Sequence, residues 1–142
     1  MGHLEVSEVG MGCMGFSHGY GPVPAKEESI QAIRAGYEAG CALFDTADSY
    51  GKEMFYPGHN EELLGQALAP FCQEVYLASK VHLEEGKVAT LSQVKAYVCQ
   101  QLEGSLQRLG TDYLDIYYLH RINEAIPLAD VAGAMATLSR KA

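Results

Sequence analysis

The sequence has no long hydrophobic run, no signal-peptide pattern and no cluster of basic residues. A membrane-spanning helix needs a run of about 20 apolar residues, so none is expected among these 142 residues. The opening MGHLEVSEVG lacks a basic segment followed by an apolar one, which favours a cytoplasmic location. The net charge of −8 argues against nucleic acid as a partner.

Closely spaced metal ligands are also missing. Cys13, Cys41, Cys72 and Cys99 lie far apart and form no CxxC pair, and the five histidines show no HExxH spacing. We therefore expect no metal site, and we interpret the cysteines as free thiols in a reducing compartment.

Apolar runs alternate with amphipathic segments along the chain. Strands are predicted at 9–16, 41–46, 75–81 and 113–120, and helices at 26–40, 60–69, 90–110 and 127–138. The order β-α-β-α-β-α-β-α predicts an α/β domain with a parallel sheet and right-handed crossovers. The nearly continuous apolar runs are typical of strands covered on both faces.

Several helix ends have recognisable signals. Asn60 is a candidate N-cap, and Thr90 and Gln93 have the spacing of a capping box. Gly110 is expected to end that helix, and Pro127 to begin the last one.

The glycine-rich start, GMGCMG, places Gly10, Gly12 and Gly15 in a GxGxxG pattern. A dinucleotide-binding fold would need a helix directly after it, whereas FSHGYGPVP predicts a loop. We favour a short strand in which the glycines allow backbone or ligand to approach closely.

Four chemically active residues follow three of the predicted strands. Asp45 and Tyr50 follow the second strand, Lys80 ends the third and His120 ends the fourth. In parallel α/β folds the carboxyl ends of the strands bind ligands. An ammonium lowers the pKa of a nearby phenol, a carboxylate keeps a buried lysine charged, and an imidazole can orient or relay a proton.

Each of these residues also has a purely structural interpretation. Asp45 could cap a turn, Tyr50 could be an aromatic residue at the rim, Lys80 could extend to solvent, and His120 could be hydrogen-bonded at a strand end. Asp48, three residues after Asp45, is predicted to be a turn residue.

The motifs GMGCMGFS, GCALFDTADSYG, NEELLGQAL, VYLASKV and DYLDIYYLHR resemble those of the aldo-keto reductases, most closely the bacterial, fungal or plant-type oxidoreductases of that family. The resemblance implies a (β/α)8 TIM barrel that reduces a small carbonyl substrate with NADPH. It implies that Tyr50 is the general acid, that Lys80 and Asp45 adjust the acidity of Tyr50, and that His120 orients the carbonyl. Asp45 and Gly15 are the expected cofactor-binding residues.

The chain is short for that fold. A (β/α)8 barrel takes about 250 residues, so residues 1–142 are interpreted as one partial domain of about four βα units, a half barrel whose C-terminal half is absent. The main NADPH-binding elements are expected in that half, and independent activity is expected to be weak or absent. The alternatives are an inactive remnant or an interaction module that self-associates through exposed sheet edges. A lyase or isomerase with a Schiff base at Lys80 is a third.

Overall fold

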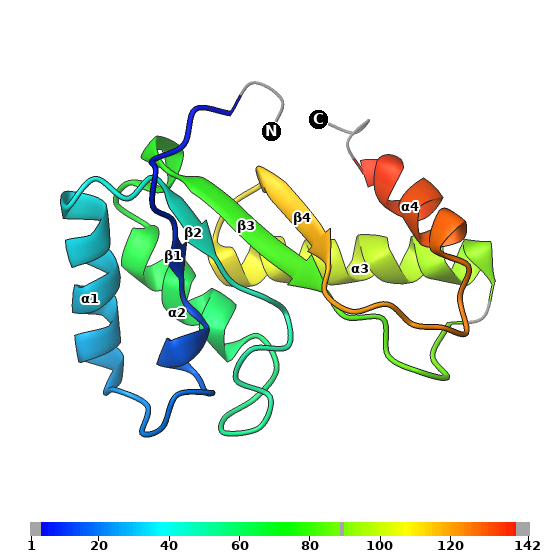
Figure 1. Ribbon diagram of the computed structural model, residues 1–142, viewed down its shortest axis with the longest axis horizontal. Coiled ribbons are helices and arrows are strands. Elements are labelled where there is room, and N and C mark those ends of the chain that lie inside the picture. Colours follow the sequence, from blue (N-terminus) through cyan, green and yellow to red (C-terminus); the bar gives the residue numbers. More distant parts are fainter. Residues whose placement is uncertain (1–3, 89, 139–142) are drawn as a thin grey trace.

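A parallel sheet with the strand order β1-β2-β3-β4 forms the centre of the molecule (Figure 1). The computed structural model describes residues 4–88 and 90–138. The strands are β1 (Met11–Gly12), β2 (Leu43–Asp45), β3 (Tyr76–Val81) and β4 (Ile116–Leu119). The helices are α1 (Lys26–Glu38), α2 (His59–Leu68), α3 (Leu91–Leu109) and α4 (Leu128–Ala136), with short 3-10 turns at Met14–Phe16 and Cys72–Glu74. The predicted alternation of four strands and four helices is confirmed.

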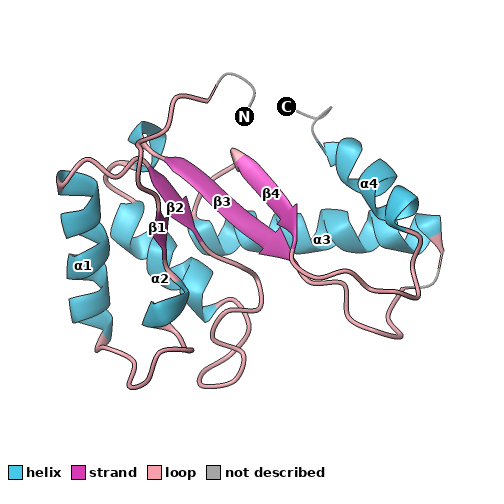
Figure 2. Ribbon diagram, in the orientation of Figure 1, coloured by secondary structure: helices cyan, strands magenta, loops and turns pink. Residues whose placement is uncertain are grey.

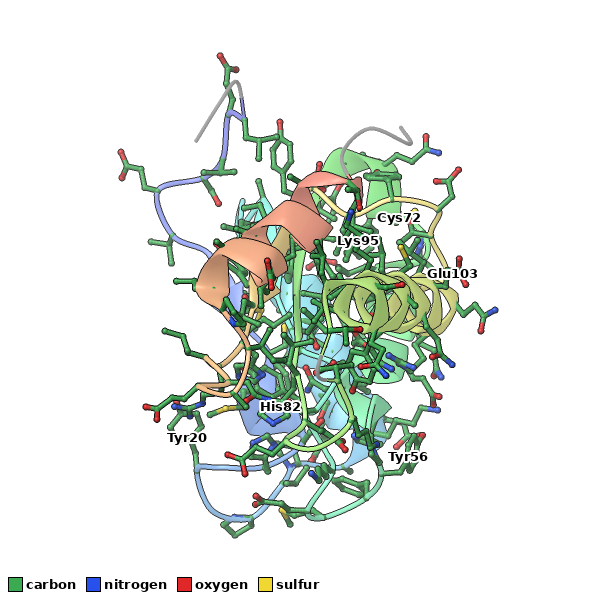
Figure 3. The ribbon with its side chains drawn as sticks, turned by 90° about the vertical axis from the view of Figure 1, so that its right-hand side faces the viewer. Tyr20, Tyr56, Cys72, His82, Lys95 and Glu103 are labelled. Carbon is green, nitrogen blue, oxygen red and sulfur yellow. The ribbon has the colours of Figure 1, made fainter. Side chains whose placement is uncertain are left out.

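The register of the parallel strands brings their carboxyl ends to one edge of the sheet. Asp45 of β2 pairs with Gly12 and Ala78, and Lys80 of β3 pairs with Tyr118 of β4. Figure 3 shows this end through His82, which follows β3, whereas Cys72, which precedes β3, lies at the opposite end of the molecule.

The predicted helix signals at Thr90 and Gly110 are confirmed. The Thr90 hydroxyl accepts a hydrogen bond from the Gln93 amide at 3.3 Å, and the Gln93 side chain accepts one from the Thr90 amide at 3.1 Å. Gly110 adopts a φ of 70°, a left-handed conformation that ends α3 at little cost for glycine.

Three local predictions are wrong. The first strand is shorter than 9–16, because the chain turns into a 3-10 helix at Met14. Asn60 is not an N-cap: Gly58, with a φ of 86°, occupies that position. The Asn60 side chain is instead buried, where it donates to the Cys13 carbonyl and accepts from the Thr46 hydroxyl.

The third wrong prediction concerns coverage of the fourth strand. Figure 2 shows α2 and α3 behind the strands, with α1 and α4 beyond opposite edges of the sheet. Tyr118 of β4 is 38% exposed, so this strand is not covered on both faces. The prediction holds for β3, where the consecutive residues Leu77, Ala78 and Ser79 point to alternate faces and are all buried.

Two apolar clusters form the core on the helix-covered side. One joins α1 and α2 to β2 and includes Ile33, Phe44 and Leu64, and the other joins α3 and α4 to β3 and includes Val81 and Val98. All five of these side chains are fully buried. Both clusters therefore pack the helices against one face of the sheet.

A polar seam lies between α2, α3 and β3. Glu61 of α2 is fully buried, and its carboxylate accepts hydrogen bonds at 2.6 Å from both the Ser79 hydroxyl and Nε of Arg108. Arg108 belongs to α3, and its side chain is 25% exposed. The seam thus ties two helices to the strand that carries Lys80.

Candidate functional site

The four predicted site residues converge at the carboxyl ends of β2, β3 and β4. Asp45 is the last residue of β2, Lys80 lies one residue before the end of β3, and His120 directly follows β4. Tyr50 lies in the turn after β2, where its amide donates to the Ala47 carbonyl. Parallel pairing puts these positions at one rim, so the structure brings together residues up to 75 positions apart.

The Lys80 ammonium is the centre of the arrangement. Nζ donates to Oδ1 of Asp45 at 2.5 Å, to the Thr46 carbonyl at 2.8 Å and to the Tyr50 phenol oxygen at 3.2 Å. Its side chain is only 16% exposed, while that of Asp45 is 33% exposed. An ammonium has three N–H groups, so these contacts use all of its donors.

Tyr50 is enclosed by the other site residues. It is 9% exposed, and Nζ of Lys80 lies 4.8 Å from the centre of its ring. The rings of His18 and His120 meet it edge-on, with centroids 5.4 Å and 5.5 Å away. The phenol oxygen accepts from Lys80, so its own proton is available to another acceptor.

The surroundings of His120 favour its neutral form. Its pKa is lowered from the ordinary histidine value, first by burial and then by the positive charges of Lys80, His82 and Arg121, against the opposing effect of Asp45. The Ser49 hydroxyl lies 3.2 Å from Nδ1 of His120. A neutral imidazole is suited to donate a hydrogen bond from one nitrogen while accepting one at the other.

A cavity of about 230 Å³ opens beside the Tyr50 and His120 rings. His18, Ser49 and His82 also line it, and the sequence analysis did not select them. Ser49 directly precedes Tyr50, and His82 lies two residues after Lys80. Closeness to the selected strand ends was therefore the one available signal for both.

Asp48 lies in a turn, as predicted, but it is also buried. It is 8% exposed, and its Oδ2 accepts the His82 amide at 3.0 Å. Burial raises the pKa of its carboxyl group to about 6. Asp48 thus connects the turn that carries Tyr50 to the segment that leaves β3.

Gly15 lies in the 3-10 turn after β1, at some distance in sequence from the lysine cluster. A Cβ at this position would lie 3.1 Å from the ring of Tyr20, but this side chain is 81% exposed and can shift, so packing alone does not require glycine here. The helix that a dinucleotide-binding GxGxxG motif requires does not follow.

Comparison with known proteins identifies the family. The model of the aldo/keto reductase family matches residues 8–141. The chain belongs to this family. Among similar solved structures are the holo form of an aldo-keto reductase from Bacillus halodurans and an aldo-keto reductase from Klebsiella pneumoniae in complex with NADPH.

Both proteins are longer than this aldo/keto reductase chain. The Bacillus protein is 32% identical, with a TM-score of 0.77, over 97% of this chain and 44% of its own. The Klebsiella protein is 34% identical, with a TM-score of 0.75, over 96% of this chain and 42% of its own. The four βα units therefore match half of a (β/α)8 barrel, and the chain spans less than half the length of these relatives.

Within residues 4–88 and 90–138, no group of three or more His, Cys, Asp or Glu side chains could hold a metal ion. No helix in the described part of the chain is both long and apolar enough to cross a bilayer.

Proposed function

We propose that this chain carries the catalytic residues of an NADPH-dependent reductase that converts aldehyde or ketone carbonyls to alcohols. The observation that carries the proposal is the Lys80 ammonium, which joins the Asp45 carboxylate to the Tyr50 phenol beside a cavity. Membership of the aldo/keto reductase family supports it, as does the presence of NADPH in the Klebsiella structure.

Tyr50 is the proposed general acid. Its phenol would give its proton to the carbonyl oxygen, and the positive charge of Lys80 would stabilise the phenolate left behind. Asp45 would supply the opposite charge that the largely buried Lys80 ammonium needs as a partner. His120 would donate a second hydrogen bond to the same oxygen and so orient the carbonyl.

The residues present fit the reacting end of the cofactor. When bound, NADPH supplies the hydride that adds to the carbonyl carbon. The carboxylate of Asp45, a third exposed, can accept hydrogen bonds from a cofactor hydroxyl, and the turn at Gly15 is proposed as a second contact. We assign the phosphate contacts to segments outside these four units, because the chain spans 42% of the Klebsiella protein.

Titration of the 142-residue chain with NADPH, followed by cofactor fluorescence and by turnover of nitrobenzaldehyde, tests the proposal. We expect weak binding, and we expect Tyr50→Phe to lower any turnover by about 10²- to 10⁴-fold, because the proton donor is lost. Tyr20→Phe, at an exposed tyrosine, is the matched control. Equal turnover by Tyr50→Phe and the parent would contradict the role of Tyr50.

The other interpretations predict different outcomes. No binding of NADPH at any concentration would leave the inactive remnant as the better description of this chain. The Schiff-base alternative at Lys80 has less support, because Nζ already makes hydrogen bonds to Asp45, Thr46 and Tyr50 and none of these contacts leaves it free to attack a carbonyl.

Self-association is a second proposed property, and the two open edges of the sheet favour it. An apolar hollow of about 420 Å³ borders β4 between α3 and α4, and another of about 540 Å³ borders β1 beside the end of α1. Unpaired strand edges next to apolar surface are sites where a second chain can add. Two copies with four strands each would supply the eight strands of a barrel.

A further inference from the structure

The Ser49 hydroxyl reaches the imidazole of His120 across 71 positions of sequence. Ser49 is half-buried, and both of its neighbours are anchored. The Asp48 amide donates to the Lys80 carbonyl at 3.2 Å, and the Tyr50 amide donates to the Ala47 carbonyl at 3.2 Å. The Ser49 Oγ atom is therefore held in place by the same turn that positions Tyr50.

A neutral imidazole has one N–H and one unprotonated nitrogen, and a partner at one of them selects the tautomer. Ser49 occupies Nδ1 of His120, which leaves Nε2 as the nitrogen that can serve the cavity. A serine hydroxyl can donate or accept, so this contact alone does not select one form.

The proposed reduction favours one of the two tautomers. A carbonyl oxygen in the cavity has two lone pairs, and the Tyr50 proton would satisfy one of them. Lys80 has no N–H left for the other, because Asp45, Thr46 and Tyr50 take all three. Of the other donors that line the cavity, the His120 imidazole has its ring centroid 5.5 Å from that of Tyr50, and it can supply the second hydrogen bond when Nε2 carries the proton and Nδ1 accepts from Ser49.

We propose that Ser49 is a positioning residue: its hydroxyl donates to Nδ1 of His120 and fixes the imidazole as the Nε2–H tautomer that can donate to a substrate oxygen. The inference rests on the proposed function for its choice of tautomer, whereas the position of the proton on His120 is a property that the free chain already has. It can therefore be measured without cofactor or substrate.

Long-range ¹H–¹⁵N NMR of the full chain with ¹⁵N-labelled histidine, at about pH 7.5, reports the tautomer of His120 directly. The variant His120→Gln assigns the His120 signals by their loss. We expect Nδ1 of His120 at the shift of an unprotonated nitrogen and Nε2 at that of a protonated one. In Ser49→Ala both resonances should move toward each other as the tautomers mix, and Ser49→Thr should restore the parent pattern.

The chain contains a matched internal control. Ser17 contacts Nδ1 of His59 at 2.9 Å, and this second serine–histidine pair should keep its shifts in Ser49→Ala, which also reports that the variant is folded. An Nδ1–H form of His120 in the parent would overturn the proposal. Unchanged His120 shifts in Ser49→Ala would overturn it as well. Absence of NADPH binding would contradict the proposed function, but it would not change the tautomer measured for His120.

Discussion

At the scale of single residues, Asp48 holds a carboxyl group almost entirely out of water. Burial is the main cause of its pKa of about 6, and the negative charge of Glu61 adds to it. The His82 and Ser49 amides and the positive charge of Arg108 act in the opposite direction. One buried oxygen of Asp48, Oδ1, has no hydrogen-bond partner among the described residues.

The raised pKa has a defined effect on stability. An unfolded aspartate has a pKa of about 4, so between pH 4 and pH 6 the folded chain binds more protons than the unfolded chain. The contribution of Asp48 to the free energy of unfolding therefore falls as the pH rises through this range.

We predict that Asp48→Asn is more stable than the parent at pH 7 by about 1–3 kcal/mol, and about equal to it at pH 4. The amide oxygen can still accept the His82 N–H, while the charge that burial penalises is gone. Urea unfolding at both pH values measures the difference. Asp112→Asn, at an exposed position, is the control. A difference that does not change with pH would contradict the assignment.

Some residues of the candidate site could be predicted from the sequence, and others could not, for a physical reason. Asp45, Tyr50, Lys80 and His120 were found because chemically active side chains at the ends of parallel strands meet at one rim. Ser49 could not be predicted in this way, because its proposed role depends on its distance from the His120 imidazole, which follows β4. Whether the four selected residues perform catalysis stays a prediction until the variants are measured.

At the scale of elements, the buried pair of Glu61 and Arg108 links α2 to α3. Removing one partner of a buried ion pair leaves an uncompensated charge, which costs about 3–5 kcal/mol. Arg108 is 25% exposed, so water can solvate part of its charge. We expect Glu61→Ala to lower the free energy of unfolding by about 3 kcal/mol, as measured by urea unfolding.

The chain offers a matched comparison in the exposed pair of Glu84 and Lys87, whose side chains are 39% and 59% exposed. Because exposed pairs are worth about 0–1 kcal/mol, Glu84→Ala should change stability by no more than that. Equal losses for Glu61→Ala and Glu84→Ala would show that burial does not decide the strength of these pairs.

Helix positions were predicted well where local signals determine them. The Thr90 capping box and Gly110 act within a few residues, so the ends of α3 could be read from the sequence. The contacts of Asn60 could not, because its partners lie 14 and 47 positions away. Gly65 is a similar case: a Cβ there would lie 2.7 Å from the carbonyl oxygens of Arg108 and Leu109, so it marks a close approach of α2 to α3.

At the scale of the whole molecule, the two edge strands β1 and β4 each lie beside a mostly apolar hollow. Ala39 lines the hollow beside β1, and Ala132 lies on the exposed side of α4 beyond β4. Four parallel strands span half of an eight-stranded barrel, so a rotation of about 180° would bring α4 of one copy beside α1 of the other at both contacts.

We predict that the chain forms a dimer of twice its 15.4 kDa mass, measurable by light scattering after size exclusion. Ala39→Lys and Ala132→Glu should each weaken the dimer by placing a charge in an apolar contact. Mixing the two variants should restore it, because one contact then gains an ion pair and the other is unchanged. Gln100→Glu, at an exposed position of α3, is the control. A monomer at all concentrations would contradict self-association.

The order of the strands in the sheet has a consequence during synthesis. Each strand pairs with the strand before it in the chain, and no strand waits for a later one to be inserted beside it. A chain that emerges from the ribosome from its N-terminus can therefore add one βα unit at a time to a growing sheet. Lys80 meets Asp45 and Tyr50 once the third strand is in place, so this cluster can form before His120 has been synthesised.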